Sequence, residues 1–275
     1  MTDEMRLRVL ERYEKRYGEI WEDIERGLFE EEDAFFLMGP ANYFFSAGGM
    51  KWAVDPMFRV PRSGVSMSLI DPDRVFLSLD FILLTHRHGD HFDPALMRRY
   101  PGINWIVPAH MEAEIPEECR EHMTVVRPGD VLLRGNIKIH AFSSLHYDAG
   151  TTLGVEETGY FVDTGKQRIL LPGDVREYNA EKYPKFEDAT HLFVHVWLGR
   201  RNALNWPCGE YPAQQAEFAL AFGAKKMYLA HLLEATRTME DMWTYAHAGL
   251  VLDEIIARRP SAEVYIPMTG RKNLL

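Results

Sequence analysis

The chain has 275 residues, with 31 basic and 41 acidic side chains, which gives a formal net charge of −10. This charge disfavours a long nucleic acid as a partner, because binding a polyanion needs clustered Lys and Arg to displace counterions from the phosphates. A chain of this length buries about 70–75% of its unfolded surface, so it needs neither disulfides nor a structural metal for stability. Any bound metal is therefore expected to serve chemistry.

The sequence predicts a cytoplasmic protein that does not cross a membrane. Its two cysteines, Cys119 and Cys208, lie far apart and match no metal or redox spacing, which indicates free thiols in a reducing compartment. The N-terminal residues are rich in charge and contain no apolar segment typical of a secretory signal. The most apolar stretch, 75–84, is interrupted by Asp80 and is far shorter than the roughly 20 residues of a membrane span.

The chain begins with the pattern of an amphipathic helix. Between Thr2 and Glu32 apolar residues recur every three or four positions, which predicts one long helix or two helices joined near Gly18. These residues are Leu7, Leu10, Tyr13, Tyr17, Ile20, Ile24 and Leu28. The stripe is expected to dock on the chain's own domain, and homodimerisation through it is the alternative.

Short strand-like segments and helical patterns then alternate along the chain. A hairpin is predicted from the strands 43–46 and 51–54, with Gly48 and Gly49 in its turn. Further strands are predicted at 35–38, 81–85, 105–107, 125–126, 131–133, 137–142, 160–162, 169–171, 192–196, 227–229 and 264–266, and helices after Asp93, around 111–122, and at 212–222 and 239–259. This mixture predicts an α/β fold. The length allows two domains, but the lack of linkers favours a single α/β body after the first helix.

Three histidines and one aspartate lie within six residues, directly after the apolar run 81–84. The segment reads Thr85-His86-Arg87-His88-Gly89-Asp90-His91. A loop at the end of a buried strand can bring such side chains into a small volume, and imidazole and carboxylate ligands suit Zn²⁺, Mn²⁺ or Fe²⁺. A metal site is expected here, and a solvated polar turn is the alternative.

This segment resembles the His-x-His-x-Asp-His motif of the metallo-β-lactamase-fold hydrolases. Four further residues resemble later motifs of that family, in the same order along the chain. They are Asp55 after the strand 51–54, His146 after the strand 137–142, Asp174 in Leu170-Leu171-Pro172-Gly173-Asp174, and His231 after the strand 227–229.

The resemblance covers about residues 35–270. It implies a four-layer αββα sandwich as the hydrolase domain, residues 34–275, preceded by an N-terminal helical extension, residues 1–33. Within the family, the scaffold around Gly48-Gly49 and Asp55 is similar to a broad group of metal-dependent hydrolases that resemble ascorbate-6-phosphate lactonase.

The resemblance also implies a dinuclear centre of two divalent metal ions, zinc first, with manganese or iron as alternatives. His86, His88 and His146 would hold one ion, and Asp90, His91 and His231 the other, with Asp174 bridging them and Asp55 supporting the loop. Two such ions share a water and lower its pKa, so a metal-bridging hydroxide is the expected nucleophile, and Asp90 or a metal-bound water is the expected proton acceptor. The expected substrate is a small molecule, anionic or neutral, with a lactone, ester, amide or phosphodiester bond.

Two more residues are predicted to contact the substrate. His195 lies in the strand 192–196 and is interpreted as a partner of the site, with a hydrogen-bonded core histidine as the alternative. Arg200 carries planar donors that suit phosphate or carboxylate, with a solvent-exposed role as the alternative.

The alternative function is a phosphodiesterase or RNA-processing nuclease of the same fold. A flavodiiron protein is disfavoured, because those proteins resemble this fold but carry Glu where this chain has His88. A non-catalytic relative would be expected to have lost ligands, and the motif residues are all present.

Overall fold

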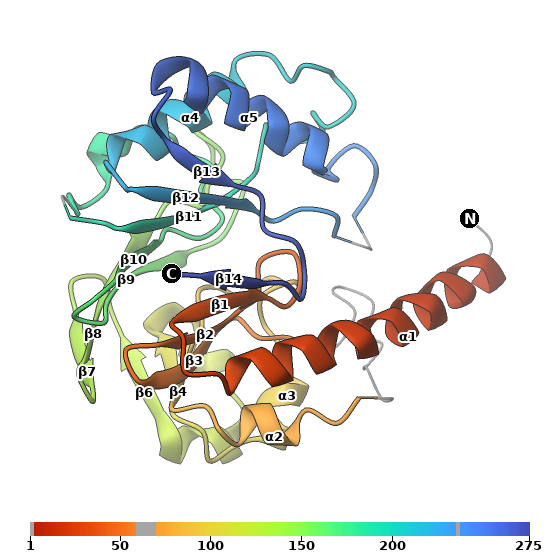
Figure 1. The fold of residues 1–275 in the computed structure, drawn as a ribbon, viewed down its shortest axis with the longest axis vertical. Coiled ribbons are helices and arrows are strands. Elements are labelled where there is room, and N and C mark those ends of the chain that lie inside the picture. Colours follow the sequence, from red (N-terminus) through yellow and green to blue (C-terminus); the bar gives the residue numbers. More distant parts are fainter. Residues whose placement is uncertain (1–2, 59–69, 187, 235–236) are drawn as a thin grey trace.

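Two β-sheets lie face to face in the computed structural model, with helices on both outer sides (Figure 1). The structure describes residues 3–58, 70–186, 188–234 and 237–275, and the side chains from Lys15 onward. The arrangement confirms the predicted four-layer αββα sandwich.

Each sheet contains seven strands. The first has the spatial order β14 (Lys272–Leu274), β1 (Ala34–Leu37), β2 (Tyr43–Ala47), β3 (Met50–Val54), β4 (Phe81–Leu83), β5 (Trp105–Pro108), β6 (Met123–Val126). The second has the order β13 (Glu263–Tyr265), β12 (Lys226–Ala230), β11 (His191–His195), β10 (Arg168–Leu171), β9 (Glu157–Asp163), β8 (Ile137–Ser144), β7 (Val131–Arg134).

The helices cover the outer face of each sheet (Figure 1). The first sheet carries α1 (Asp3–Leu28), α2 (Asp73–Phe76) and α3 (Pro94–Arg99), and the second carries α4 (Tyr211–Ala221) and α5 (Tyr245–Arg258). Three 3₁₀ helices complete the described elements, η1 (Ala109–Glu114), η2 (Glu117–His122) and η3 (Ala180–Lys182). Among the described residues, no helix combines the length and the apolar character needed to span a membrane.

Aromatic side chains fill the layer between the two sheets. The ring centroid of Phe35 lies 4.8 Å from that of Phe193 and 4.7 Å from that of Tyr228. Because β1 is buried on both faces, its sequence, Ala-Phe-Phe-Leu, is a continuous apolar run rather than an alternating pattern. Separate apolar cores lie under α1 and under α4 and α5.

The N-terminal segment forms one continuous helix, α1, rather than two helices joined at Gly18. Tyr17, Trp21, Ile24 and Leu28 are buried in the core of the first sheet, and the Tyr17 hydroxyl donates to the carbonyl of Met38 at 2.6 Å. The predicted stripe therefore docks on the chain's own first sheet over this part.

The first half of that stripe, Leu7, Leu10 and Tyr13, lies outside the described side chains. The boundary between an extension of residues 1–33 and a domain of residues 34–275 stays a prediction. Homodimerisation through α1 also stays a prediction.

Three local expectations differ from the structure. The helix expected around 111–122 is divided into η1 and η2 because Pro116 cannot donate a helical hydrogen bond. The helix expected from 239 begins at Tyr245, because Thr244 and His247 form a capping box at its start. The edge strand β14 was not expected, because its sequence, Lys-Asn-Leu, shows no apolar run.

The strand directions bring distant loops to one edge of the sandwich. β3 and β4 are parallel neighbours, so their carboxyl ends place Asp55 beside the loop 84–91. In the second sheet β10, β11 and β12 are parallel, and β8 runs in the same direction because β9 is antiparallel to both β8 and β10. The residues that follow β8, β10 and β12 are therefore delivered to a common edge.

Candidate metal centre

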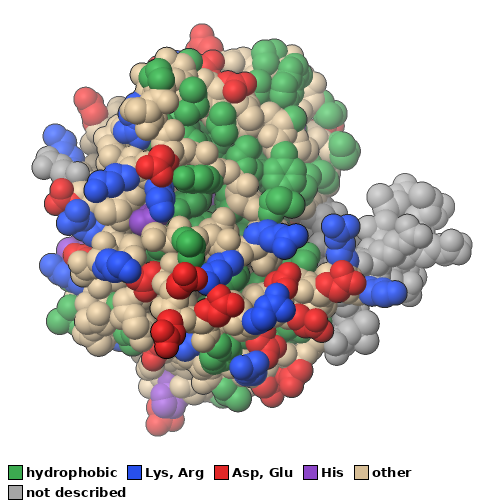
Figure 2. Space-filling model, in the orientation of Figure 1, with side chains coloured by type: hydrophobic (Ala, Val, Ile, Leu, Met, Phe, Trp, Pro, Cys, Tyr) green, Lys and Arg blue, Asp and Glu red, His purple; other side chains and the backbone are tan. Residues whose placement is uncertain are grey.

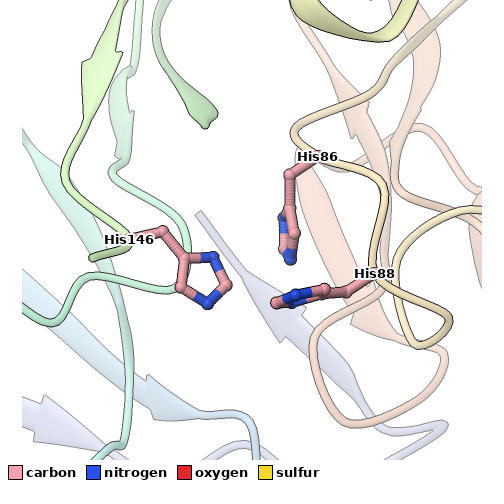
Figure 3. A group of neighbouring side chains, drawn as sticks. All are labelled: His86, His88 and His146. Carbon is pink, nitrogen blue, oxygen red and sulfur yellow. The ribbon is translucent and has the colours of Figure 1, made fainter. Parts of the chain in front are cut away.

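The histidine group consists of His86, His88 and His146, which point toward one another from two loops (Figure 3). The ring centroids of these residues are 4.6–4.8 Å apart. His86 and His88 belong to the loop after β4, and His146 follows β8. One ring nitrogen from each residue lies within 4.8 Å of the others, a spacing that one metal ion can bridge.

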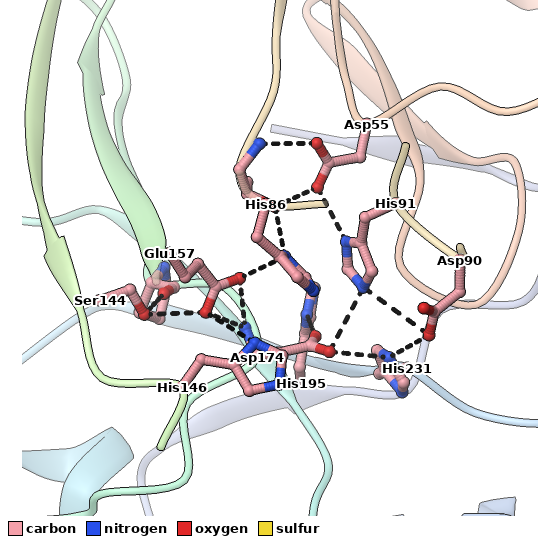
Figure 4. Close-up of polar contacts among 12 residues, drawn as sticks. Asp55, His86, Asp90, His91, Ser144, His146, Glu157, Asp174, His195 and His231 are labelled. Atoms are coloured by element: carbon pink, nitrogen blue, oxygen red, sulfur yellow. Dashed lines mark hydrogen bonds and ion pairs between the residues drawn. The ribbon is translucent and has the colours of Figure 1, made fainter. Parts of the chain in front are cut away.

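The carboxylate group consists of Asp90, His91, Asp174 and His231, and all four side chains are buried. Oδ2 of Asp174 lies 3.3 Å from Nε2 of His91 and 3.2 Å from Nε2 of His231 (Figure 4). Oδ2 of Asp90 lies 3.5 Å from the same nitrogen of His231. The two groups adjoin, since the His86 and His91 ring centroids are 4.2 Å apart.

These two groups contain all seven residues predicted as metal ligands. Together they come from four separate segments of the chain, the loop 86–91 and the single positions His146, Asp174 and His231. The structure thus places side by side the residues that the sequence linked only by the order of their motifs along the chain.

A model of the beta-lactamase superfamily domain matches residues 54–232, which is more than half of the chain. The chain belongs to the beta-lactamase superfamily. The resemblance to the metallo-β-lactamase-fold hydrolases is confirmed, and the described residues include a His and Asp cluster that fits a metal site. The narrower similarity to ascorbate-6-phosphate lactonase stays a prediction.

Solved structures share the fold at low sequence identity. The diiron β-hydroxylase CmlA from Streptomyces venezuelae is 15% identical with a TM-score of 0.62, over 90% of this chain and 55% of that one, so this chain spans about half of CmlA. The metallo hydrolase Igni18 from Ignicoccus hospitalis is 15% identical (TM-score 0.60, 88% and 98% covered). The isothiocyanate hydrolase from Delia radicum gut bacteria is 16% identical (TM-score 0.62, 88% and 98% covered). No curated protein matches the chain.

Glu157 is the main residue of the metal centre that the sequence analysis did not identify. It opens β9, is fully buried, and its two carboxylate oxygens lie 3.0 Å from Nδ1 of His86 and 3.6 Å from Nδ1 of His146. It also accepts the backbone N–H of Asp174 at 3.0 Å and the hydroxyl of Ser144 at 3.1 Å. One carboxylate therefore lies beside both His86 and His146 and accepts the backbone N–H of Asp174 (Figure 4). The only local signal was a charged residue at the start of an apolar strand.

Asp55 supports the loop 84–91, as predicted from the resemblance. It accepts hydrogen bonds from the backbone N–H of Thr85 at 2.8 Å and from the Thr85 hydroxyl, and its Oδ2 lies 2.8 Å from Nδ1 of His91. Its backbone is in the left-handed region with φ 45°, a conformation that Asp and Asn tolerate better than most residues. Asp55 also lies close enough to His86 and His91 for a shared ion, but these hydrogen bonds already occupy its oxygens.

His195 lies behind Asp174. Its Nδ1 is 2.6 Å from Oδ1 of Asp174, and its Nε2 is 2.8 Å from the hydroxyl of Tyr43, which reaches across from the first sheet. Both ring nitrogens are used within the protein, so His195 positions Asp174. Its predicted contact with the substrate stays a prediction. Tyr43 was not anticipated, because nothing marks its hydroxyl among the aromatic residues of β2.

Arg237 approaches the carboxylate group from the loop after β12. Its Nη2 donates to Oδ2 of Asp90 at 3.1 Å, and its Nε donates to Glu234. The guanidinium group therefore contacts both Asp90 and Glu234. Although burial opposes this, these two carboxylates, together with Asp174, raise the pKa of Arg237. Arg237 follows no motif that would have revealed it.

The two groups differ in protonation. Burial lowers the pKa of His86 and of His146 well below the usual value, so both rings are neutral and can offer a lone pair. Burial would also lower the pKa of His231, but the carboxylates of Asp174 and Asp90 raise it to about 9. The same two carboxylates overcome burial and raise the pKa of His91.

The donor set fits divalent metal ions. Nε2 of His86 and Nε2 of His146 are buried without a hydrogen-bond partner, which is costly unless something else satisfies them. Neutral imidazole nitrogens together with the oxygens of Asp90 and Asp174 are ligands that zinc, manganese and iron accept. His86 and His91 each present a second ring nitrogen to a buried carboxylate, as is usual for metal-bound histidines.

Arg200 lies beside the ligand groups and not within them. It lines a cavity of about 1120 Å³ together with Arg176 and Trp197. These last two residues also border a small hollow next to Asp174 and His231. The predicted substrate contact of Arg200 stays a prediction, taken up below.

Proposed function

We propose that this chain is a hydrolase that uses two divalent cations to cleave a lactone, ester, amide or phosphodiester bond in a small organic substrate. The observation that carries the proposal is the convergence of seven potential ligands from four segments into two adjoining groups. The three imidazoles of the histidine group favour zinc. The carboxylate group also suits manganese or iron, which leaves the second ion open to either class.

When bound, the two cations would supply an activated water and polarise the bond to be cleaved. The protein's own residues would position the reactants and move the proton. Asp90, which Arg237 positions by a hydrogen bond, is the proposed acceptor for a proton released during hydrolysis. Asp174 is kept between His91, His231 and His195, so its carboxylate does not need to reorganise during the reaction.

A phosphodiesterase acting on a small nucleotide is the second candidate, because the arginines beside the ligand groups suit a phosphoryl group. A nuclease acting on long RNA fits less well. On the face shown in Figure 2, Lys and Arg side chains of the described residues are interspersed with Asp and Glu rather than gathered into a band. Such a band would be needed to follow a nucleic-acid backbone.

We also propose a cytoplasmic location. Cys119 and Cys208 are both free and buried, which supports a reducing compartment. Cell fractionation with an antibody to the chain would test this, and recovery outside the cytoplasmic fraction would contradict it.

The function is tested by metal analysis of the purified chain together with a panel of lactones, acyl esters, amides and phosphodiesters. We expect two divalent ions per chain and turnover of at least one bond class, with both reduced in His88→Ala. Equal turnover by the wild type and His88→Ala would show that the activity comes from a contaminant. Metal content below one ion per chain after reconstitution would overturn the dinuclear centre.

A further inference from the structure

The cavity of about 1120 Å³ next to the carboxylate group is larger than the roughly 300–1000 Å³ of common small-molecule sites. Arg176 and Trp197 form part of its wall and also border the hollow beside Asp174 and His231. A molecule whose reactive bond lies at the ligand groups can therefore extend into this space. Two residues of the cavity wall are also close in sequence to predicted ligands: Asp148 is two residues after His146, and Arg176 is two residues after Asp174.

Two arginines share one carboxylate on the cavity wall. Oδ1 of Asp148 accepts from Nη1 of Arg176 at 2.8 Å, and Oδ2 of Asp148 accepts from Nε of Arg200 at 2.6 Å. Both cations lower the pKa of Asp148, although burial opposes this, so the carboxylate is ionised. Two guanidinium groups thus share this one carboxylate, and the carboxylate of Asp241 also stabilises the positive charge of Arg200.

The two guanidinium groups differ in freedom. The Arg176 side chain is 8% exposed and its guanidinium lies over the Trp197 ring, 5.3 Å from the ring centroid, which fixes its plane. The Arg200 side chain is 44% exposed and lines the cavity, and it contacts Asp148 through Nε, so that contact does not use its two Nη groups. A fork of parallel N–H donors matches a carboxylate or a phosphate.

The other acidic residues that line the cavity lie away from the two arginines or are paired elsewhere. Glu177 pairs with Lys182, and Glu217 pairs with Arg258. Glu210 lies at the N-terminal end of α4, where the helix dipole favours a negative charge. The cavity is thus cationic at the Asp148 wall and acidic along α4.

Aromatic residues form an apolar part of the cavity wall. Trp197 and Tyr211 pack edge to face with ring centroids 5.6 Å apart, and the Tyr178 hydroxyl donates to the backbone carbonyl of Trp197. All three line the cavity and are only partly buried. This wall offers flat apolar surface next to the cationic corner, which suits a carbon-rich body that carries an anionic group.

We propose that this cavity is the substrate subsite and that it selects organic anions, with Arg176 and Arg200 binding a carboxylate or phosphate group of the substrate. Asp148 positions the two guanidinium groups, and the body of the substrate lies against Trp197 and Tyr211. The proposal deepens the proposed hydrolase function, on which it rests, by naming the substrate class.

Anion binding by the metal-loaded full-length chain tests the subsite without any turnover. Titration calorimetry with inorganic phosphate and with benzoate should give a Kd about 10–100-fold weaker in Arg200→Gln than in the wild type, the effect of losing a charge-assisted pair. Arg201→Gln is the matched control, because Arg201 is the next residue, is 77% exposed and does not line the cavity. An anion bound only at the metal ions would bind equally to both variants, and that result would overturn the subsite.

The two ligands and a charge reversal sharpen the result. Weaker benzoate binding with unchanged phosphate binding in Arg200→Gln would assign the subsite to carboxylates, and the reverse would assign it to phosphates. Arg200→Glu should abolish binding of the preferred anion. Retained binding in Arg200→Glu would contradict the proposal, and unchanged melting temperatures would show that both variants fold.

Hydrolysis separates this proposal from the function on which it rests. With a matched pair of esters, one neutral and one bearing a carboxylate, Arg200→Gln should lower kcat/KM for the charged ester about 10-fold or more and leave the neutral ester unchanged. Equal loss for both esters would contradict anion selection. Failure of every variant to hydrolyse any compound would contradict the hydrolase function, while the calorimetry would still decide the subsite.

Discussion

The histidine group and the carboxylate group share the loop 86–91 but differ in charge. The histidine group offers three imidazoles, of which burial keeps His86 and His146 neutral. The carboxylate group holds two acids against two histidines whose pKa values are raised. The first group is thus ready to accept an ion, whereas the second must release protons to do so.

The two groups also differ in how they are held in place. A single buried carboxylate, Glu157, contacts two members of the histidine group. The carboxylate group is held from several sides, by Asp55 behind His91, by His195 behind Asp174 and by Arg237 beside Asp90. The histidine group is thus held by Glu157 and by the Thr85 hydroxyl, which lies 3.0 Å from Nδ1 of His86, whereas the carboxylate group is held by three side chains from separate segments.

Removing one ligand from each group should have the largest effect. His146→Ala should lose the ion of the histidine group and keep the other, and His231→Ala should do the reverse. Each should lower kcat by about 10³-fold or more, because a catalytic ion contributes several kcal/mol to stabilising the transition state. Metal content by mass spectrometry and kcat check this, with circular dichroism to confirm folding. Loss of both ions in both variants would show that the groups are not independent.

Replacing the supporting carboxylates should weaken metal binding at one group at a time, with a smaller effect than removing a ligand. Glu157→Gln should weaken metal affinity at the histidine group about 10–100-fold, and Asp55→Asn should do the same at the carboxylate group, which is the usual effect of losing such a support. Asn suits the left-handed backbone of position 55. Competition with a chromophoric chelator measures each affinity. Glu156→Gln, at an exposed neighbouring residue, is the control, and equal affinities in Glu157→Gln and this control would rule out the support.

The sequence predicted the ligands far better than their supports. His86, His88, Asp90 and His91 lie in one loop after a buried strand, so local pattern alone marks them. Glu157 matters only because the register of β8 and β9 places it opposite Ser144 at the site's edge. No single segment contains that information.

Contacts between the two sheets are likewise not contained in any single segment of the sequence. Tyr43 meets His195 only because the two sheets pack face to face, so its hydroxyl could not be interpreted from β2 by itself. The α/β class was predictable from the mixture of strand and helix patterns. The hairpin turn was predictable because a tight turn needs positive φ, which glycine adopts readily, and Gly48 and Gly49 both have positive φ in the structure. The splitting of the 111–122 helix at Pro116 was missed although the signal was local.

The pH dependence of the stability of the metal-free protein should reflect the titration of the carboxylate group. The pKa of His231 is about 9 in the folded chain and about 6.5 when unfolded. A raised pKa adds stability that is fully present below about pH 6.5 and is lost as the pH rises through about 9. His86 and His146 have lowered pKa values, so both are neutral above pH 6.5 in either state and add no slope there.

We therefore expect the melting temperature of the metal-free chain to fall by a few degrees between pH 7 and pH 9. Differential scanning calorimetry after chelation should show a smaller fall in His231→Ala and an unchanged fall in His146→Ala. The same fall in all three proteins would show that His231 does not cause it and would assign the slope to other groups, His91 among them.

The smallest effect should come from Tyr43→Phe, because Tyr43 reaches the carboxylate group only through His195. The change removes the 2.8 Å contact between the Tyr43 hydroxyl and Nε2 of His195, while the Nδ1 contact to Asp174 remains. Losing one buried hydrogen bond costs about 1 kcal/mol, so metal affinity at the carboxylate group should fall less than about 10-fold. The histidine group lies outside this chain of contacts, and its affinity should not change. A loss at both groups would mean that support passes between them through Asp174, whose backbone N–H Glu157 accepts, and the two metal positions would then act as one unit.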